Sequence, residues 1–89
     1  MNYQQKLEAL NTLAECSLKM YEPNDWYVEQ DVMIGDGDGT GVSVFGNGCS
    51  PEEAVNDHWS QLTTGQMSSE YIIANEKHWK WNKFMWREV

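Results

Sequence analysis

The sequence predicts an α+β domain, in which an N-terminal helix and a second helix pack on a small antiparallel sheet and a tryptophan-rich hairpin ends the chain. Apolar residues recur at helical spacing near the N-terminus, alternate with polar residues from Trp26, and follow a helix-capping signal at Ser50. A chain of 89 residues has no room for a second hydrophobic core, so residues 1–89 are expected to form one domain.

Residues 3–21 are expected to form an amphipathic helix. Their apolar side chains lie three or four positions apart, and charged side chains take the opposite face. Pro23 and Asn24 are expected to end this helix. The apolar positions are Tyr3, Leu7, Leu10, Leu13, Ala14, Leu18 and Tyr21.

From Trp26 to Ile34 the period changes to two, which predicts a strand. Trp26, Val28, Val32 and Ile34 are expected on one side, and Tyr27, Glu29 and Asp31 on the other. The glycine- and aspartate-rich segment 36–41 predicts a turn, because these residues tolerate positive φ. Residues 42–45 then form the returning strand of a hairpin.

A helix is predicted from Ser50 to about Thr64. Ser50 can cap its N-terminus, Pro51 suits the first turn because its missing N–H is not needed there, and Glu53 completes a capping box. Residues 71–74 are expected to form a strand. The last residues are expected to form a hairpin around a two-residue turn at 82–83, although a helix beginning at Ser69 is an alternative. In that hairpin Trp81 faces Phe84 and Trp79 faces Trp86.

Charge is distributed very unevenly along the chain. Residues 20–76 contain eleven carboxylates and no lysine or arginine, whereas four of the six basic residues follow within the last thirteen positions. Such a field repels nucleic acid and anionic membranes and attracts basic protein surfaces. We therefore expect no direct nucleic-acid or membrane binding. The candidate partner-binding residues are Tyr27, Glu29, Asp31, Asp36 and Asp38.

The residues that usually carry catalysis or metal binding do not form a recognisable pattern. His58 and His78 have no partner at metal-ligand spacing, and no serine or cysteine can be paired with a base. A non-enzymatic protein without metal or cofactor is therefore expected. Cys16 and Cys49 read as reduced thiols of a cytoplasmic protein, because their spacing matches no redox motif.

Two families share short features with this chain. The order helix, strand, turn, strand, with Gly46, Gly48, Ser50 and Ala54 opening a helix, is similar to the double-stranded-RNA-binding domain. Glu52 and Glu53 stand where that family has lysines, so the resemblance implies its fold without its RNA-binding residues. The segment from Gly48 to Ala54 also resembles the junction that opens a helix in HicB antitoxins.

The short acidic chain as a whole resembles small bacteriophage-encoded proteins. Such proteins often inhibit host defence or nucleic-acid enzymes, some by mimicking nucleic acid. The resulting hypothesis is a phage-type inhibitor that docks its carboxylates on a basic, nucleic-acid-handling protein. The alternatives are a HicB-like antitoxin that neutralises a basic ribonuclease toxin, a small-ligand binder that sequesters a nucleotide signal, and a soluble domain whose charge serves only solubility.

Overall fold

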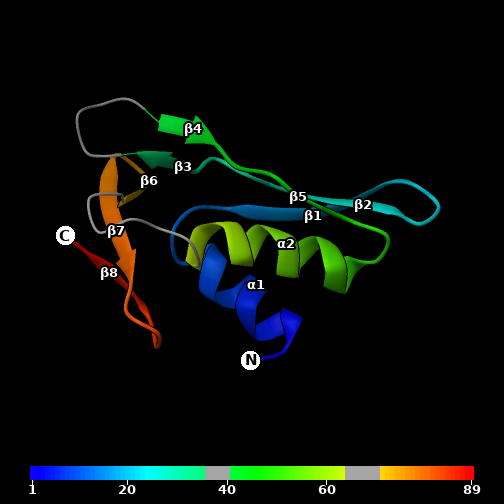
Figure 1. The fold of residues 1–89 in the computed structure, drawn as a ribbon, viewed down its shortest axis with the longest axis horizontal. Coiled ribbons are helices and arrows are strands. Elements are labelled where there is room, and N and C mark those ends of the chain that lie inside the picture. The colour runs from blue at the N-terminus through cyan, green and yellow to red at the C-terminus, as the bar shows by residue number, and fades with distance from the viewer. Residues whose placement is uncertain (36–40, 64–70) are drawn as a thin grey trace.

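The computed structural model describes residues 1–35, 41–63 and 71–89 (Figure 1). Two helices and eight strands form in these residues, and the strands make two antiparallel sheets with the orders β1-β2-β5 and β4-β3-β6-β7-β8. Helix α2 runs along the three-stranded sheet, and α1 packs beside α2 (Figure 1). The expected α+β class is confirmed.

The N-terminal helix α1 spans Tyr3–Asn11, so the expected helix over residues 3–21 is wrong in its second half. The chain leaves the helix at Thr12 and forms strand β1, Cys16–Glu22, which pairs with β2, Asp25–Gln30. Pro23 and Asn24 make the hairpin turn between these strands, with Asn24 at φ 63°. Pro23 and Asn24, which were expected to end a helix, therefore form a turn between two strands. Both residue types are also common in such turns.

The predicted alternation after Trp26 is confirmed, but the strand is broken into two. Val28, Gln30 and Val32 are buried, whereas Glu29 and Asp31 are exposed. The N–H of Val32 donates to the carbonyl oxygen of Gln30, which bends the chain at Asp31. Strand β3, Met33–Gly35, therefore belongs to the second sheet, where it pairs with β4, Gly41–Ser43, as the expected hairpin. Most of the predicted turn, residues 36–40, lies outside the described residues.

Helix α2 spans Pro51–Thr63, as the capping signal predicts. The Ser50 Oγ accepts the N–H of Glu53 at 3.2 Å, while the Glu53 carboxylate accepts the N–H of Cys49 at 2.8 Å. Strand β5, Gly46–Gly48, precedes the helix and pairs with β2. A Cβ at Gly48 would lie 2.5 Å from the Cβ of Glu53, so these glycines allow the strand to lie directly against α2.

The C-terminal segment forms strands β6, Tyr71–Ala74, β7, Lys77–Trp81, and β8, Trp86–Glu88, which confirms strands rather than a helix. The predicted register is wrong: Trp81 pairs with Trp86 and Trp79 with Glu88. The Oδ1 of Asn82 accepts the N–H groups of Phe84 and Met85, and this stabilises a four-residue loop in place of the expected two-residue turn.

Both sheets and both helices contribute to one hydrophobic core. Where the C-terminal hairpin joins this core, the Trp59 ring packs edge to face against two other rings. The centroid distances are 4.7 Å to Trp81 and 6.1 Å to Trp86. The hairpin tryptophans therefore help to close the core, as expected. Neither helix in the described ranges is long and apolar enough to cross a membrane. The fully buried core side chains include Leu10, Leu13, Val28, Val55, Leu62 and Ile72.

Candidate functional site

Three of the five predicted partner-binding residues lie on the outer side of β2 or at the bend that directly follows it. Tyr27 is half-buried there, Glu29 is exposed, and Asp31 is exposed at the bend that follows. Asp36 and Asp38 lie outside the described residues, so their part in the site stays a prediction. The period-two pattern correctly placed Glu29 and Asp31 away from the core, whereas their role in binding stays a prediction.

These carboxylates border a shallow surface groove of about 440 Å³, which we call the acidic groove. It is formed by the connection from α1 to β1, by β1 and β2, and by the turn between β6 and β7. Segments far apart in the sequence therefore share one site, with three carboxylates and one cation. The lining residues are Ala14, Glu15, Ser17, Lys19, Glu29, Gln30, Asp31 and Asn75.

Among the described residues, the single cation that lines the acidic groove is already paired. Lys19 Nζ lies 3.1 Å from Glu29 Oε2, and both side chains are about half exposed. The hydrogen bond to this carboxylate and its negative charge raise the pKa of Lys19, so the amine stays protonated. Glu15 and Asp31 have no ion-pair partner within the described part of the chain. Two carboxylates are therefore available to an incoming cation.

A buried amide holds the floor of the groove. Gln30 Nε2 donates to the carbonyl oxygens of Leu10 and Ala14 at 2.6 and 2.8 Å, and its Oε1 lies 2.9 Å from His58 Nε2. Burial lowers the pKa of His58 to about 4, so the ring is neutral at pH 7 and its Nε2–H donates to the amide oxygen. The hydrogen bonds fix the end of α1, and hence Glu15, relative to Asp31.

Two other carboxylates of the acidic body serve the fold. Asp57 Oδ2 accepts the main-chain N–H of Asn47 at 2.9 Å, and Glu53 accepts that of Cys49. Both contacts hold β5 and its loop against the first turns of α2. These two charges are exposed, but their hydrogen bonds reduce their freedom to bind a partner.

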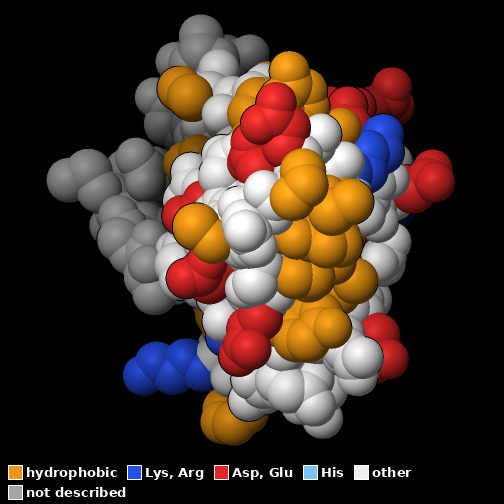
Figure 2. Space-filling model, turned by 90° about the vertical axis from the view of Figure 1, so that its right-hand side faces the viewer, with side chains coloured by type: hydrophobic (Ala, Val, Ile, Leu, Met, Phe, Trp, Pro, Cys, Tyr) orange, Lys and Arg blue, Asp and Glu red, His pale blue; other side chains and the backbone are white. Residues whose placement is uncertain are grey.

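The end of the molecule where the β1–β2 hairpin turns carries an elongated hydrophobic patch with acidic side chains around it (Figure 2). Met20 and Tyr21 of β1 are 57% and 73% exposed. Large exposed apolar side chains bordered by charge are typical of protein interfaces. The expected helix placed Tyr21 in its buried stripe, which the structure contradicts.

Sequence reasoning missed Glu15, Lys19 and Asn75 as parts of the site. The first two were assigned to a helix, and Asn75 reaches the groove through the turn between β6 and β7. A period-two reading of residues 16–22 would have placed Lys19 on the outer face beside Tyr27, its partner in the register.

The described side chains do not form an arrangement that holds a metal. No group of three or more His, Cys, Asp and Glu residues is suitably placed in ranges 1–35, 41–63 and 71–89. Cys16 and Cys49 are free thiols, and burial raises the pKa of Cys16 to about 11, so its nucleophilic thiolate is disfavoured. Comparisons of the chain with protein-family models, curated proteins and solved structures found no match.

Proposed function

We propose that this is a non-enzymatic binding protein whose acidic groove docks on a basic segment of a nucleic-acid-handling protein and inhibits it. The observation that carries the proposal is the convergence of Glu15, Glu29 and Asp31 on one groove. Its only cation among the described residues, Lys19, is paired with Glu29. A lysine or arginine from a partner would meet two carboxylates held in place by the fold.

The geometry favours a protein partner over a free metal ion. The groove is shallow and open to solvent along β1 and β2, and Glu15 and Asp31 are on separate segments that flank the buried Gln30. Tyr27, opposite Lys19 on the same sheet face, adds an aromatic side chain of the kind that anchors interfaces. Tyr21, two positions after Lys19 on β1 and 73% exposed, would extend this contact toward the end of the hairpin.

The long-range charge supports a nucleic-acid-handling partner. Proteins that bind nucleic acid carry clusters of lysine and arginine that match a row of phosphates. Residues 20–76 of this chain present eleven carboxylates without a compensating lysine or arginine, which would attract such a cluster from solution. Occupying the cluster would then block its access to nucleic acid.

A salt-dependent pull-down from a host lysate tests the proposal when two charge-matched variants are compared. Glu15→Lys with Asp31→Lys reverses the groove, whereas Glu8→Lys with Glu52→Lys reverses two exposed carboxylates on the helices. Each pair adds four to the net charge of −8 and gives −4. We expect the wild type and the helix variant to retain one basic nucleic-acid-binding protein at low salt, and the groove variant to lose it.

The purified partner then allows inhibition to be measured. Added wild-type protein is expected to reduce nucleic-acid binding by the partner, with an effect that weakens as salt rises. If both charge variants lose the partner equally, binding follows net charge and the groove is not the docking site, so the proposal is wrong. If all three proteins capture the same set, the acidic charge serves solubility and the proposal is wrong as well.

A further inference from the structure

Strand β8 forms one edge of the five-stranded sheet, and part of its main chain is unpaired. The N–H of Val89 donates to His78 at 2.9 Å and that of Asn82 to Met85 at 3.1 Å, so the hydrogen-bonded pairs of the hairpin include Lys80 with Arg87. In an antiparallel ladder the intervening residues point their main-chain groups the other way. Trp86 and Glu88 therefore direct N–H and C=O groups away from β7. Within the described residues no further strand follows β8.

A mostly apolar groove lies beside this edge, and we call it the tryptophan groove. Its volume is about 320 Å³, and helix α1 forms the wall opposite the hairpin. Trp86 belongs both to the open edge and to this groove. Its indole Nε1 is buried without an acceptor among the described residues, which is a costly state for a polar group. The lining residues are Ala9, Thr12, Trp79, Trp81, Phe84, Met85 and Trp86.

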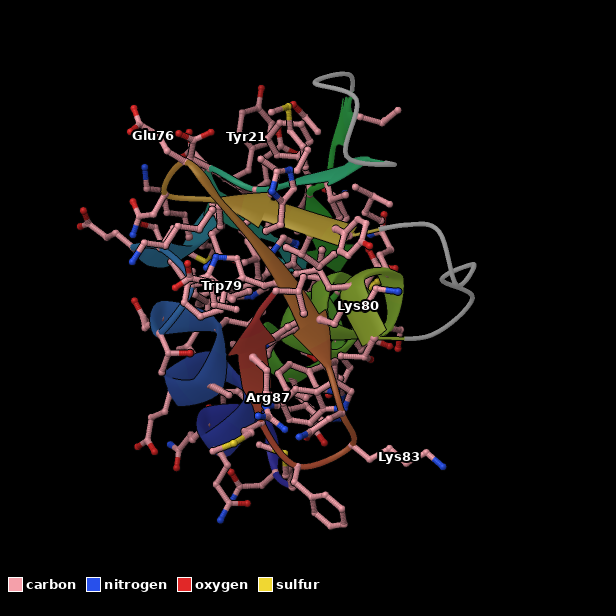
Figure 3. All side chains as sticks on the ribbon, turned by 90° about the vertical axis from the view of Figure 1, so that its left-hand side faces the viewer. Tyr21, Glu76, Trp79, Lys80, Lys83 and Arg87 are labelled. Carbon is pink, nitrogen blue, oxygen red and sulfur yellow. The ribbon has the colours of Figure 1, made fainter. Side chains whose placement is uncertain are left out.

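The hairpin that carries the tryptophan groove has a charge opposite to that of the acidic groove. Residues 77–88 contain four basic side chains and one carboxylate, Glu88, which lies 3.6 Å from Lys77. Lys80 lies over the ring of Tyr71, while Lys83 and Arg87 are exposed and have no ion pair in the described ranges. Figure 3 shows Arg87 projecting from β8 and Lys83 extending from the loop.

We propose that the β8 edge binds an extended peptide of another protein, in which one large apolar residue is flanked on both sides by aspartate or glutamate. A peptide residue opposite Trp86 places its side chain on the same face as Trp86, toward the tryptophan groove. Its two neighbours point to the other face, where Arg87 lies. Because side chains alternate along a strand, β8 is expected to select a peptide with the order acidic, apolar, acidic. Main-chain hydrogen bonds to the strand edge would supply affinity.

A second copy of this chain fits the edge less well. Pairing of two β8 edges about a two-fold axis would place the exposed Arg87 and Lys83 of each copy near those of the other, which disfavours association. The proposed peptide site is also separate from the acidic groove, so it does not rest on the function proposed for that groove.

The test uses the whole protein and a synthetic seven-residue peptide, acetyl-Thr-Val-Asp-Phe-Asp-Val-Thr-amide. Binding is followed by tryptophan fluorescence and by main-chain amide exchange. Replacing both aspartates with lysine, or the phenylalanine with alanine, is expected to weaken binding at least about tenfold. With the peptide antiparallel to β8, methylating the phenylalanine main-chain nitrogen is expected to do the same, because that N–H then faces Trp86. Methylating the next aspartate, whose N–H faces solvent, is the matched control and is expected to leave the affinity within about twofold.

Changes in the protein provide the second arm. The Arg87 side chain is exposed, so Arg87→Glu should leave the fold intact. This substitution is expected to reverse the preference between the aspartate and lysine peptides. The amides of Trp86 and Glu88 are expected to become protected on binding. The proposal is overturned if no peptide binds, if both methylated peptides bind equally, or if protection appears elsewhere. It is also overturned if the edge instead takes single-stranded oligonucleotide or a second copy, seen as concentration-dependent sedimentation.

Discussion

Replacing Gln30 with leucine tests whether one buried amide joins α1 to the rest of the fold. Gln30 is 5% exposed, and its amide contacts the carbonyl oxygens of Leu10 and Ala14 and the Nε2 of His58. Leucine has a similar volume and no polar atom. The substitution therefore removes hydrogen bonds while leaving little empty space.

The expected loss follows from the partners left behind. The Leu10 carbonyl also accepts the N–H of Leu13 at 3.0 Å, so it keeps a donor. The Ala14 carbonyl and the His58 Nε2–H have no other partner among the described residues. Each buried polar group without a partner costs about 1–3 kcal/mol, so the free energy of unfolding is expected to fall by about 4 kcal/mol. At about 0.05–0.15 kcal/mol per residue, this is a large share of the stability of such a domain.

Urea unfolding followed by circular dichroism measures this loss. With a slope of about 2 kcal/mol per molar urea, the midpoint is expected to fall by about 2 M. His58→Leu leaves the amide oxygen of Gln30 without its donor. The double variant Gln30→Leu with His58→Leu removes both this oxygen and the His58 N–H, so neither is left unpaired. The double variant should therefore be less destabilised than the sum of the single variants. A loss below about 1 kcal/mol for Gln30→Leu, or strictly additive effects, would refute the reasoning.

The same unfolding assay checks three further predictions, which concern the pH dependence of stability, Gly46→Ala, and a comparison of Trp86→Ala with Phe84→Ala. Burial lowers the pKa of His58 from 6.5 to about 4, so the unfolded state takes up a proton first as the pH falls. Stability present above pH 6.5 is expected to decline by up to about 3 kcal/mol toward pH 4, and this decline should be smaller in His58→Leu. Gly46→Ala is expected to cost about 1–3 kcal/mol, because the new Cβ would overlap the carbonyl oxygen of Ala54. Trp86→Ala is expected to lower the free energy of unfolding by about 3–5 kcal/mol. Phe84→Ala, at a side chain 86% exposed, should change it by no more than about 0.5 kcal/mol. Equal losses of stability for these two variants would contradict the register of the hairpin.

Local signals predicted the elements whose ends they define. Ser50 and Pro51 mark the start of α2 because a helix N-terminus needs a side-chain acceptor and has no use for one N–H. Residues 16–21 carried no such signal. Leu18 fits a helical stripe after Leu10 and Ala14, but it equally fits an alternating strand with Cys16 and Met20. Pairing with β2 decides between the two, and this pairing involves residues outside the segment whose pattern is read.

The C-terminal hairpin shows which part of a register the pattern determines. The predicted and observed pairings differ by two residues, because a loop held by Asn82 replaces a two-residue turn. A shift of two preserves the face of every strand residue. Trp79, Trp81 and Trp86 therefore share a face as predicted, whereas Phe84 is displaced into the exposed loop. The alternation determined the face, and the loop chemistry determined the partner.

The acidic site was predictable in sign and in part of its position, but not in which carboxylates are available. In the sequence Asp57 and Asp31 are equivalent members of one acidic run, yet Asp57 binds the N–H of Asn47 and Asp31 borders an open groove. Only the fold separates carboxylates that complete a hydrogen bond from those that have no partner among the described residues. If docking uses the latter, partner affinity should follow the position of a reversed charge rather than the net charge. The charge-matched pair of variants measures that difference directly, because both members have the same total.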